Sequence, residues 1–233
     1  MAKSRNRKKK KKGGNRSNLK GDKLIASIIK SKVRSFELYK CYCIESWEDF
    51  TILNTITVVK KYGQGKFCMG IFLVDPGCLG LKNSGFRYNI ELDEVEDLLE
   101  NFYSSHSDDY IEIEYDLANE LVWGAIEYAK ELGFSPEKDI KLTQYFLCAQ
   151  KEVTNKYELE FGVDGKPFYF AGPNDDFEFV VRKLTAKLGN GGFEFTHPIL
   201  DGHPFSGEEE EDFDEDEENN NDFAEDAEVE YLD

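Results

Sequence analysis

The sequence has no long apolar run, only three histidines and an odd number of cysteines. No stretch approaches the roughly 18 apolar residues that a membrane-spanning helix needs, which excludes an integral membrane protein. The basic start is not followed by an apolar segment and a small-residue cleavage site, so we expect no export. The cysteines lie mostly in apolar, strand-like runs, where a reduced thiol behaves as a small buried hydrophobe; they are Cys41, Cys43, Cys68, Cys78 and Cys148. These absences predict a protein of the reducing cytoplasm that does not engage membranes.

Charge is abundant, and the two signs are separated along the chain. Residues 1–23 hold eleven Lys and Arg against one acid, Asp22, whereas residues 208–233 hold sixteen Asp and Glu and no base. Removing these contributions of +10 and −16 from the net charge of −18 leaves −12 for residues 24–207. Neither end has enough apolar area to offset the chain entropy lost on ordering. We therefore predict a disordered basic arm (residues 1–21), one globular domain (residues 22–200) and a disordered acidic tail (residues 201–233).

The central region alternates between two kinds of apolar periodicity. A spacing of 3.6 residues, with suitable cap residues, predicts helices over residues 22–33, 91–102, 116–132 and 135–148, and one that ends near 188. Runs of β-branched and aromatic residues predict strands over residues 36–44, 51–62, 66–75, 86–90, 157–163, 166–170 and 193–196. Residues 63–65 and 164–165 are typical hairpin turns. The pattern indicates an α+β domain with a mainly antiparallel sheet packed by helices.

Several motifs are specific enough to suggest a family. The chain reads Leu-Val-Trp-Gly-Ala-Ile-Glu-Tyr-Ala at 121–129, followed by Leu-Gly-Phe. It reads Glu-Phe-Gly at 160–162, followed by Asp-Gly-Lys-Pro-Phe-Tyr and then Gly-Pro. With residues 70–75 and 78–80, these motifs make the region 50–196 resemble an uncharacterised group of bacterial proteins, some of which carry a SEC-C metal-binding tail or helical repeats. The resemblance implies a fold boundary and no activity, and the acidic tail stands where the Cys-rich extension of that group would be.

Metal ligands and nucleophiles are sparse. Cys41-x-Cys43 has one intervening residue, whereas zinc knuckles space their cysteines by two to four, so buried thiols are favoured. Cys78 lies in a glycine-containing turn that could expose a thiol, but nucleophilic catalysis also needs an oriented base. The candidate bases lie in no recognisable motif; they are His106, His197 and His203. We predict no metal, no cofactor and no catalytic residue.

Acidic residues near a lysine offer one enzymatic alternative. Asp164-Gly165-Lys166, with Glu158 or Glu160 upstream, matches part of a metal-dependent nuclease site, although the hairpin turn explains Asp164 and Gly165 fully. The alternative to a binding protein is a hydrolase-type enzyme with a pocket near Asp75, Cys78, Asp164 and Lys166. It requires that these polar side chains converge in one concave site.

The basic arm carries the strongest functional signal. A flexible cation of this density binds phosphate backbones without sequence preference. The predicted contacts are Arg5, Arg7, Lys8, Lys9, Lys10, Lys11, Lys12 and Arg16. We therefore expect a non-enzymatic interaction protein that contacts RNA or the ribosome through this arm.

The acidic tail suggests a second partner. Residues 208–233 intersperse aromatic and aliphatic side chains among the acids, namely Phe213, Phe223, Tyr231 and Leu232. Such a tail suits a basic protein, the chain's own basic arm or plain solvation. The sequence leaves these three interpretations open.

Overall fold

The computed structural model describes residues 18–196 apart from residues 105, 107 and 174. Residues 1–17 of the predicted arm and the chain from residue 197 onward lie outside the described residues. The strands are β1 (Glu37–Ile44), β2 (Asn54–Tyr62), β3 (Lys66–Asp75), β4 (Gly80–Ile90), β5 (Tyr110–Ile113), β6 (Phe168–Phe170) and β7 (Glu194–Thr196). The α-helices are α1 (Asn18–Lys32), α2 (Leu92–Tyr103), α3 (Tyr115–Glu131), α4 (Ile140–Thr143) and α5 (Phe177–Leu188). Short 3₁₀ turns are η1 (Val33–Ser35), η2 (Gln144–Phe146) and η3 (Gln150–Glu152).

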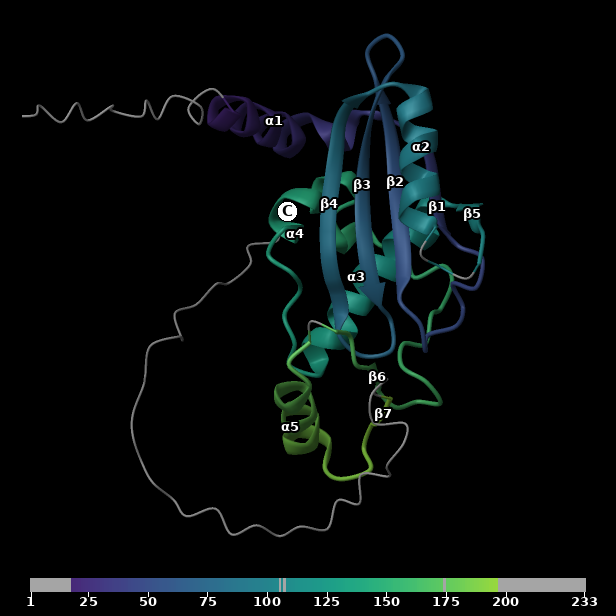
Figure 1. The fold of residues 1–233 in the computed structure, drawn as a ribbon, viewed down its shortest axis with the longest axis vertical. Helices are drawn as coiled ribbons and strands as arrows, with labels where there is room; N and C mark the ends of the chain where they lie inside the picture. Colours follow the sequence, from purple (N-terminus) through teal and green to yellow (C-terminus); the bar gives the residue numbers. More distant parts are fainter. Residues whose placement is uncertain (1–17, 105, 107, 174, 197–233) are drawn as a thin grey trace, which may run out of the picture.

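Five strands form one antiparallel sheet in the order β4-β3-β2-β1-β5. Figure 1 shows α2 on one face of this sheet and α3 on the other. The β2–β3 hairpin loop lies at one end of the sheet, and the turn from β3 to β4 lies at the opposite end. This arrangement confirms the predicted α+β fold with a mainly antiparallel sheet packed by helices.

The sheet is buried on both faces because its apolar side chains alternate between two cores. Ile56 and Val58 of β2 belong to the core on the α3 side, whereas Val59 packs with Val95 and Leu99 of α2. Successive side chains of a strand point to opposite faces, so a strand covered on both sides must be apolar at nearly every position. This requirement explains the almost continuous apolar run in β3.

The first hairpin follows its prediction, and the next strand is longer than expected. Tyr62 pairs with Lys66, which leaves a three-residue loop in which Gly63 (φ 59°) and Gly65 (φ 70°) take positive φ values that suit glycine. The strand predicted over 86–90 begins at Gly80 instead. Its first half is poor in β-formers, and pairing with the whole length of β3 overrides that weak propensity.

Two predicted helices have wrong boundaries, and one strand was missed. The helix predicted from Asp22 begins at Asn18, and Asp22 lies exposed within it. The helix predicted over 135–148 is limited to α4 and η2, because the Glu137 N–H donates to Leu81 O (3.2 Å) and ties the preceding segment to β4. The strand β5 was not predicted, since it has only four residues and reaches the sheet edge through β1.

The second predicted hairpin is confirmed only at its turn. Asp164 (φ 50°) and Gly165 (φ 76°) occupy the turn, and Val163 and Lys166 form an isolated antiparallel bridge. The strand predicted over 157–163 is absent, and the one predicted over 166–170 is shortened to β6, which pairs in parallel with β7 and not with residues 157–163. A parallel pair needs a crossover, and α5 supplies it.

Helix α5 is held at its start by a side-chain cap. The Asp176 carboxylate accepts a hydrogen bond from the Phe179 N–H at 3.0 Å. We expect Asp176→Ala to lower the free energy of unfolding by about 1 kcal/mol, because an N–H in the first turn loses its acceptor. Glu178→Ala, in the same turn but without this bond, should change it by less than about 0.5 kcal/mol in urea denaturation. Equal effects would contradict the capping role.

Candidate functional site

The four residues named for the hydrolase alternative do not line one groove. Asp75 and Cys78 are buried around the turn after β3, whereas Asp164 and Lys166 are exposed on the 164–165 turn. None of the described grooves is lined by all four residues. The hydrolase alternative therefore lacks the convergence that it requires.

Asp75 is a buried acid with one oxygen that has no hydrogen-bond partner among the described residues. Its Oδ1 accepts from the Cys78 N–H at 3.0 Å, and its Oδ2 has no hydrogen-bond partner among the described residues. Burial raises the pKa of this carboxyl to about 6, against the opposing effects of Lys82 and the amides of Leu79, Cys78 and Gly77. Burial also raises the pKa of the Cys78 thiol. A thiol without an activating base is a poor nucleophile, so these two residues favour a structural role.

A largely buried ion pair next to this turn joins β4 to the segment that precedes α5. Lys82 of β4 lies 2.6 Å from Asp175, and both side chains are 14% exposed. The Gly172 N–H donates to Asp175 Oδ2 at 2.9 Å, and the Tyr169 hydroxyl lies 3.4 Å from the same oxygen. The cluster fixes the segment before α5 against β4.

The other thiols are packing groups. Burial raises the pKa of Cys41, Cys43 and Cys68 to about 12. Lys60, 3% exposed, has its pKa lowered by burial and lies 5.3 Å from the Tyr115 ring centre. Within the part of the chain that the structure describes, no group of three or more His, Cys, Asp or Glu side chains is arranged to hold a metal ion.

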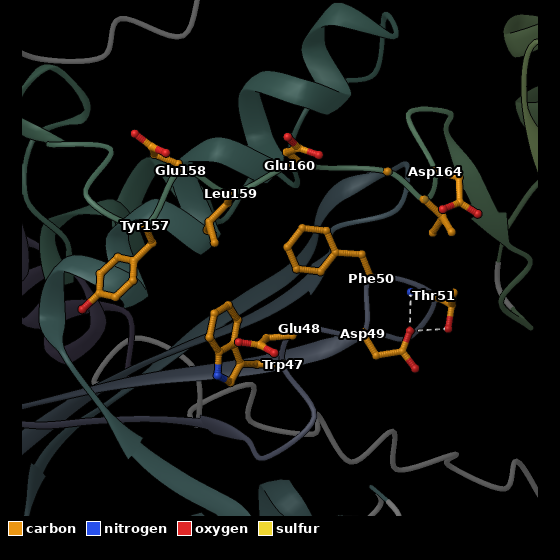
Figure 2. Close-up of a pocket in the computed structure, with 12 residues that line it drawn as sticks. Trp47, Glu48, Asp49, Phe50, Thr51, Tyr157, Glu158, Leu159, Glu160 and Asp164 are labelled. Atoms are coloured by element: carbon orange, nitrogen blue, oxygen red, sulfur yellow. Dashed lines mark hydrogen bonds between the residues drawn. The ribbon is translucent and has the colours of Figure 1, made fainter.

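A groove of about 500 Å³ lies at the end of the sheet that carries the β3–β4 turn. One wall is the β1–β2 connection (residues 47–51), and the other is the segment 157–164, which belongs to no helix or named strand. In Figure 2, Phe50, Leu159 and Trp47 lie between the walls, and Glu158 and Glu160 lie along the 157–164 wall. Asp49 braces the first wall, because its Oδ1 accepts from the Thr51 N–H (2.9 Å) and hydroxyl (2.6 Å).

Helix α3 holds the second wall in place. The buried Glu120 carboxylate accepts from the N–H groups of Lys156 (2.5 Å) and Tyr157 (2.9 Å). At the other end of the segment, the Gly162 N–H donates to Pro76 O at 3.1 Å. The wall is therefore attached to α3 at its start and to the β3–β4 turn near its end.

A glycine in α3 makes room for the ring that joins the walls. A Cβ at Gly124 would collide with the ring of Phe161, which stacks on Phe50 with ring centres 5.4 Å apart. Glycine in a helix interior costs about 0.5–1 kcal/mol relative to alanine. The close approach of the Phe161 ring explains why α3 has a glycine at position 124 despite this cost.

The groove is strongly acidic. Its lining carries the carboxylates of Glu48, Asp49, Glu158, Glu160 and Asp164, and no Lys or Arg of the described chain lines it. An adjoining groove of about 360 Å³ shares Glu158 and Leu159 with it. That second groove adds further acids and again no base from the described residues; the acids are Glu120, Glu127 and Glu131. Because they share Glu158 and Leu159, the two grooves form one continuous surface lined by acids and half-buried rings.

Searches of protein-family models, curated proteins and solved structures found no match for this chain. The resemblance of residues 50–196 to the uncharacterised bacterial group therefore stays a prediction. No helix among the described residues is long and apolar enough to cross a bilayer.

The opposite end of the sheet carries the basic surface. The predicted nucleic-acid contacts lie outside the described residues; these are Arg5, Arg7, Lys8, Lys9, Lys10, Lys11, Lys12 and Arg16. Helix α1 continues their charge with Lys23, Lys30 and Lys32, all exposed. Figure 1 shows α1 near the β2–β3 loop, far from the β3–β4 turn beside the acidic groove. Among the described residues, the exposed lysines of α1 and the acidic groove thus lie at opposite ends of the sheet.

Sequence reasoning missed the acidic groove. Its walls come from segments more than 100 residues apart, and neither forms a regular element in the groove. The sequence associates Glu158 and Glu160 with a nuclease site and gives no role to Trp47. The available signal was local: acids alternate with Tyr157, Leu159 and Phe161, and residues of both kinds line the groove.

Proposed function

We propose that this is a non-enzymatic cytoplasmic interaction protein that binds a Lys- and Arg-rich segment of a partner protein in the acidic groove. The observation that carries the proposal is a groove lined by carboxylates and aromatic rings and by no described base. The residues that an enzyme would need are separated into a buried and an exposed pair, which supports binding over catalysis. Free buried thiols support a reducing compartment.

The lining matches the chemistry of basic side chains. The exposed carboxylates provide charge-assisted hydrogen-bond acceptors for ammonium and guanidinium groups. Trp47 lines the groove, and a cation over its ring would gain about 0.5–2 kcal/mol. One face of Phe50 is stacked on Phe161, and the ring of Tyr157 already has the Lys156 ammonium 5.2 Å from its centre. The long apolar stems of Lys and Arg also pack against such rings. The acidic tail adds sixteen negative charges to the same chain and raises the encounter rate with a basic partner.

The test is a titration of the full-length chain with decalysine and decaarginine, followed by tryptophan fluorescence. Trp47 lines the groove and is half-buried, whereas Trp123 is 2% exposed, so a change in emission reports on the groove. The acidic tail also attracts these peptides, so variants of groove residues are needed to show whether the peptides bind in the groove or on the tail. Decaglutamate should leave the emission unchanged.

We expect Glu158→Lys with Glu160→Lys to weaken decalysine binding about tenfold, because two carboxylates in the wall become repulsive ammonium groups. The matched control is Glu96→Lys with Glu100→Lys, which changes the net charge equally on the exposed side of α2. The control should weaken binding by less than about twofold. Equal losses in both double variants would assign the binding to overall charge and overturn the groove.

A second candidate function is nucleic-acid contact through the basic arm. The specific observation in its favour is that α1 extends the arm with exposed lysines at the end of the molecule opposite the acidic groove. The phosphate backbone of RNA, including that of the ribosome, suits such a surface without sequence preference.

Salt dependence tests the second candidate. If the arm neutralises about six to eight phosphates, affinity for a labelled RNA strand should fall on the order of a thousandfold between about 50 and 200 mM salt, as counterions are released. Deleting residues 1–16 should abolish binding and leave the melting temperature of the domain nearly unchanged. Deleting residues 208–233 should raise affinity at low salt, where the Debye length is longest. Failure of both the full-length and the tail-deleted chain to bind at low salt would refute this candidate.

A further inference from the structure

A groove of different character lies beside α5. It has a volume of about 520 Å³ and runs between the start of β4, residues 134–138 and α5. Its floor is apolar and is formed by Leu79, Leu81, Phe134, Pro136, Phe179 and Val180. Phe179 is 44% exposed. An exposed ring at the edge of an apolar groove marks a surface that suits a further apolar group.

Lysines border this groove. Lys183 lies over the rings of Phe134 (5.0 Å) and Phe179 (5.3 Å), and Lys138 is exposed at the other side. Neither lysine forms an ion pair with a described carboxylate, whereas Lys82 at the groove end is paired with Asp175. The lining also contains the acids Glu137 and Asp175, of which Asp175 is paired with Lys82. With three lysines against two acids, the groove offers an apolar floor and a small excess of positive charge to an anionic ligand.

This chemistry differs from that of the other described grooves. The two grooves at the β1–β2 connection have no Lys or Arg of the described chain in their lining. The groove beside β5 contains Lys40, which is already paired with Glu112 at 2.6 Å. A ligand that combines aromatic and acidic side chains is therefore matched by the groove beside α5 and repelled by the acidic grooves.

The chain itself contains such a ligand, and it leaves the fold next to this groove. Residues 208–233 combine sixteen acids with Phe213, Phe223 and Tyr231. The last described residue, Thr196, accepts a hydrogen bond from the Ala171 N–H at 3.0 Å. Asp175, which lines the groove, follows Ala171 by four residues, a chain length of at most about 14 Å.

The reach of the tail is sufficient. Phe213 follows Thr196 by 17 residues, for which a flexible chain has a root-mean-square span of roughly 20–25 Å. That span exceeds the short distance from the exit point to the groove without requiring full extension. Tethering also gives the tail an effective concentration on the order of millimolar, so weak contacts suffice for occupancy.

We propose that the acidic segment 208–233 docks in the groove beside α5 of its own chain, with the Phe213 ring on the apolar floor. The acids that flank the ring, Asp212 and Asp214, face Lys138 and Lys183. This docking is independent of the proposed binding of a basic partner, because the two grooves have different linings. It sequesters part of the acidic tail and makes that part a competitor for any acidic, aromatic segment that reaches the same groove.

Photo-crosslinking in the full-length chain tests the docking. The photoreactive residue p-benzoylphenylalanine replaces Phe179, the chain is irradiated at low concentration, and crosslinked peptides are mapped by mass spectrometry. Residues 208–233 contain no Lys or Arg, so the digest uses a protease that cleaves at acidic residues. The control position is Leu92 at the start of α2, which is similarly exposed at 41%. We expect tail crosslinks from position 179 and a yield lower by about tenfold from position 92, as for a difference of 1.4 kcal/mol in contact free energy.

Variants separate the two parts of the interaction. Phe213→Ser, which keeps the charge of the tail, should lower the crosslink yield from position 179 about tenfold by removing the aromatic anchor. Lys138→Glu with Lys183→Glu should lower it similarly at low salt and less at high salt. Far-UV circular dichroism verifies that each variant is folded. Equal tail yields from positions 179 and 92, or a yield unaffected by Phe213→Ser, would overturn the proposal. Crosslinks between isotopically labelled and unlabelled chains at the yield of those within one chain would also overturn it.

Discussion

Replacing Glu120 with alanine is expected to lower the free energy of unfolding by about 2–4 kcal/mol, because two backbone donors lose their acceptor. Glu120 is 4% exposed, and its two oxygens accept from Lys156 and Tyr157 separately. An N–H group left without a partner in a buried setting costs about 1–3 kcal/mol. The change should also weaken decalysine binding, since the wall that carries Glu158 begins at these two residues.

The measurement is urea denaturation of the parent and two further variants. Glu120→Gln keeps one carbonyl acceptor and should fall between the parent and Glu120→Ala. Glu127→Ala removes an exposed carboxylate two turns further along α3 and should change stability by less than about 0.5 kcal/mol. If Glu120→Ala and Glu127→Ala were equally mild, the groove wall would not depend on Glu120.

Glu120 also shows why the groove could not be predicted. In the sequence it is one of several acids on an amphipathic helix, and an acid on a helix is ordinarily exposed. It is buried because a segment 36 residues later has no strand partner for its N–H groups and takes the carboxylate as a substitute. Such a contact depends on tertiary placement, which local periodicity does not contain. The same holds for Gly124, whose purpose is clear only once Phe161 is in place.

The predictable parts of the fold were those with long, regular signals. Helix α3 lies within one residue of its predicted limits, and the β2–β3 hairpin matches its prediction except that β2 begins three residues later. The helix predicted over 135–148 is wrong, although Ser135 and Pro136 are residues typical of a helix start. In the structure this segment turns early so that Phe146 packs where Gly70 leaves space on β3. Tertiary packing outweighed a local signal there.

The second large effect is expected at Asp75, whose stability contribution should depend on pH. The carboxyl is 3% exposed, its Oδ2 has no described partner, and burial raises its pKa to about 6. The charge of Lys82 favours ionisation of Asp75, but the ion pair of that lysine is with Asp175. Asp75 therefore has no ion-pair partner among the described residues, and one of its oxygens has no hydrogen-bond partner there.

The sign follows from the direction of the shift. A carboxyl with a raised pKa in the folded state binds its proton more tightly there than in the unfolded chain, where its pKa is about 3.9. Its favourable contribution is fully present below about pH 4 and is lost as pH rises through about 6. At 1.36 kcal/mol for each pH unit, the loss amounts to about 3 kcal/mol.

Asp75→Asn keeps an oxygen that accepts from the Cys78 N–H and removes the titration. We therefore expect the free energy of unfolding of the variant, relative to the parent, to rise by about 3 kcal/mol between pH 4 and pH 7.5. The comparison uses urea denaturation of both chains at several pH values, so that contributions of the other carboxyls cancel. Leu79→Ala, beside the same turn and without a titratable group, should show a difference from the parent that does not vary with pH. If the stability difference between Asp75→Asn and the parent also did not vary with pH, the pKa of Asp75 would not be raised in the folded state, and the predicted pH dependence would be wrong.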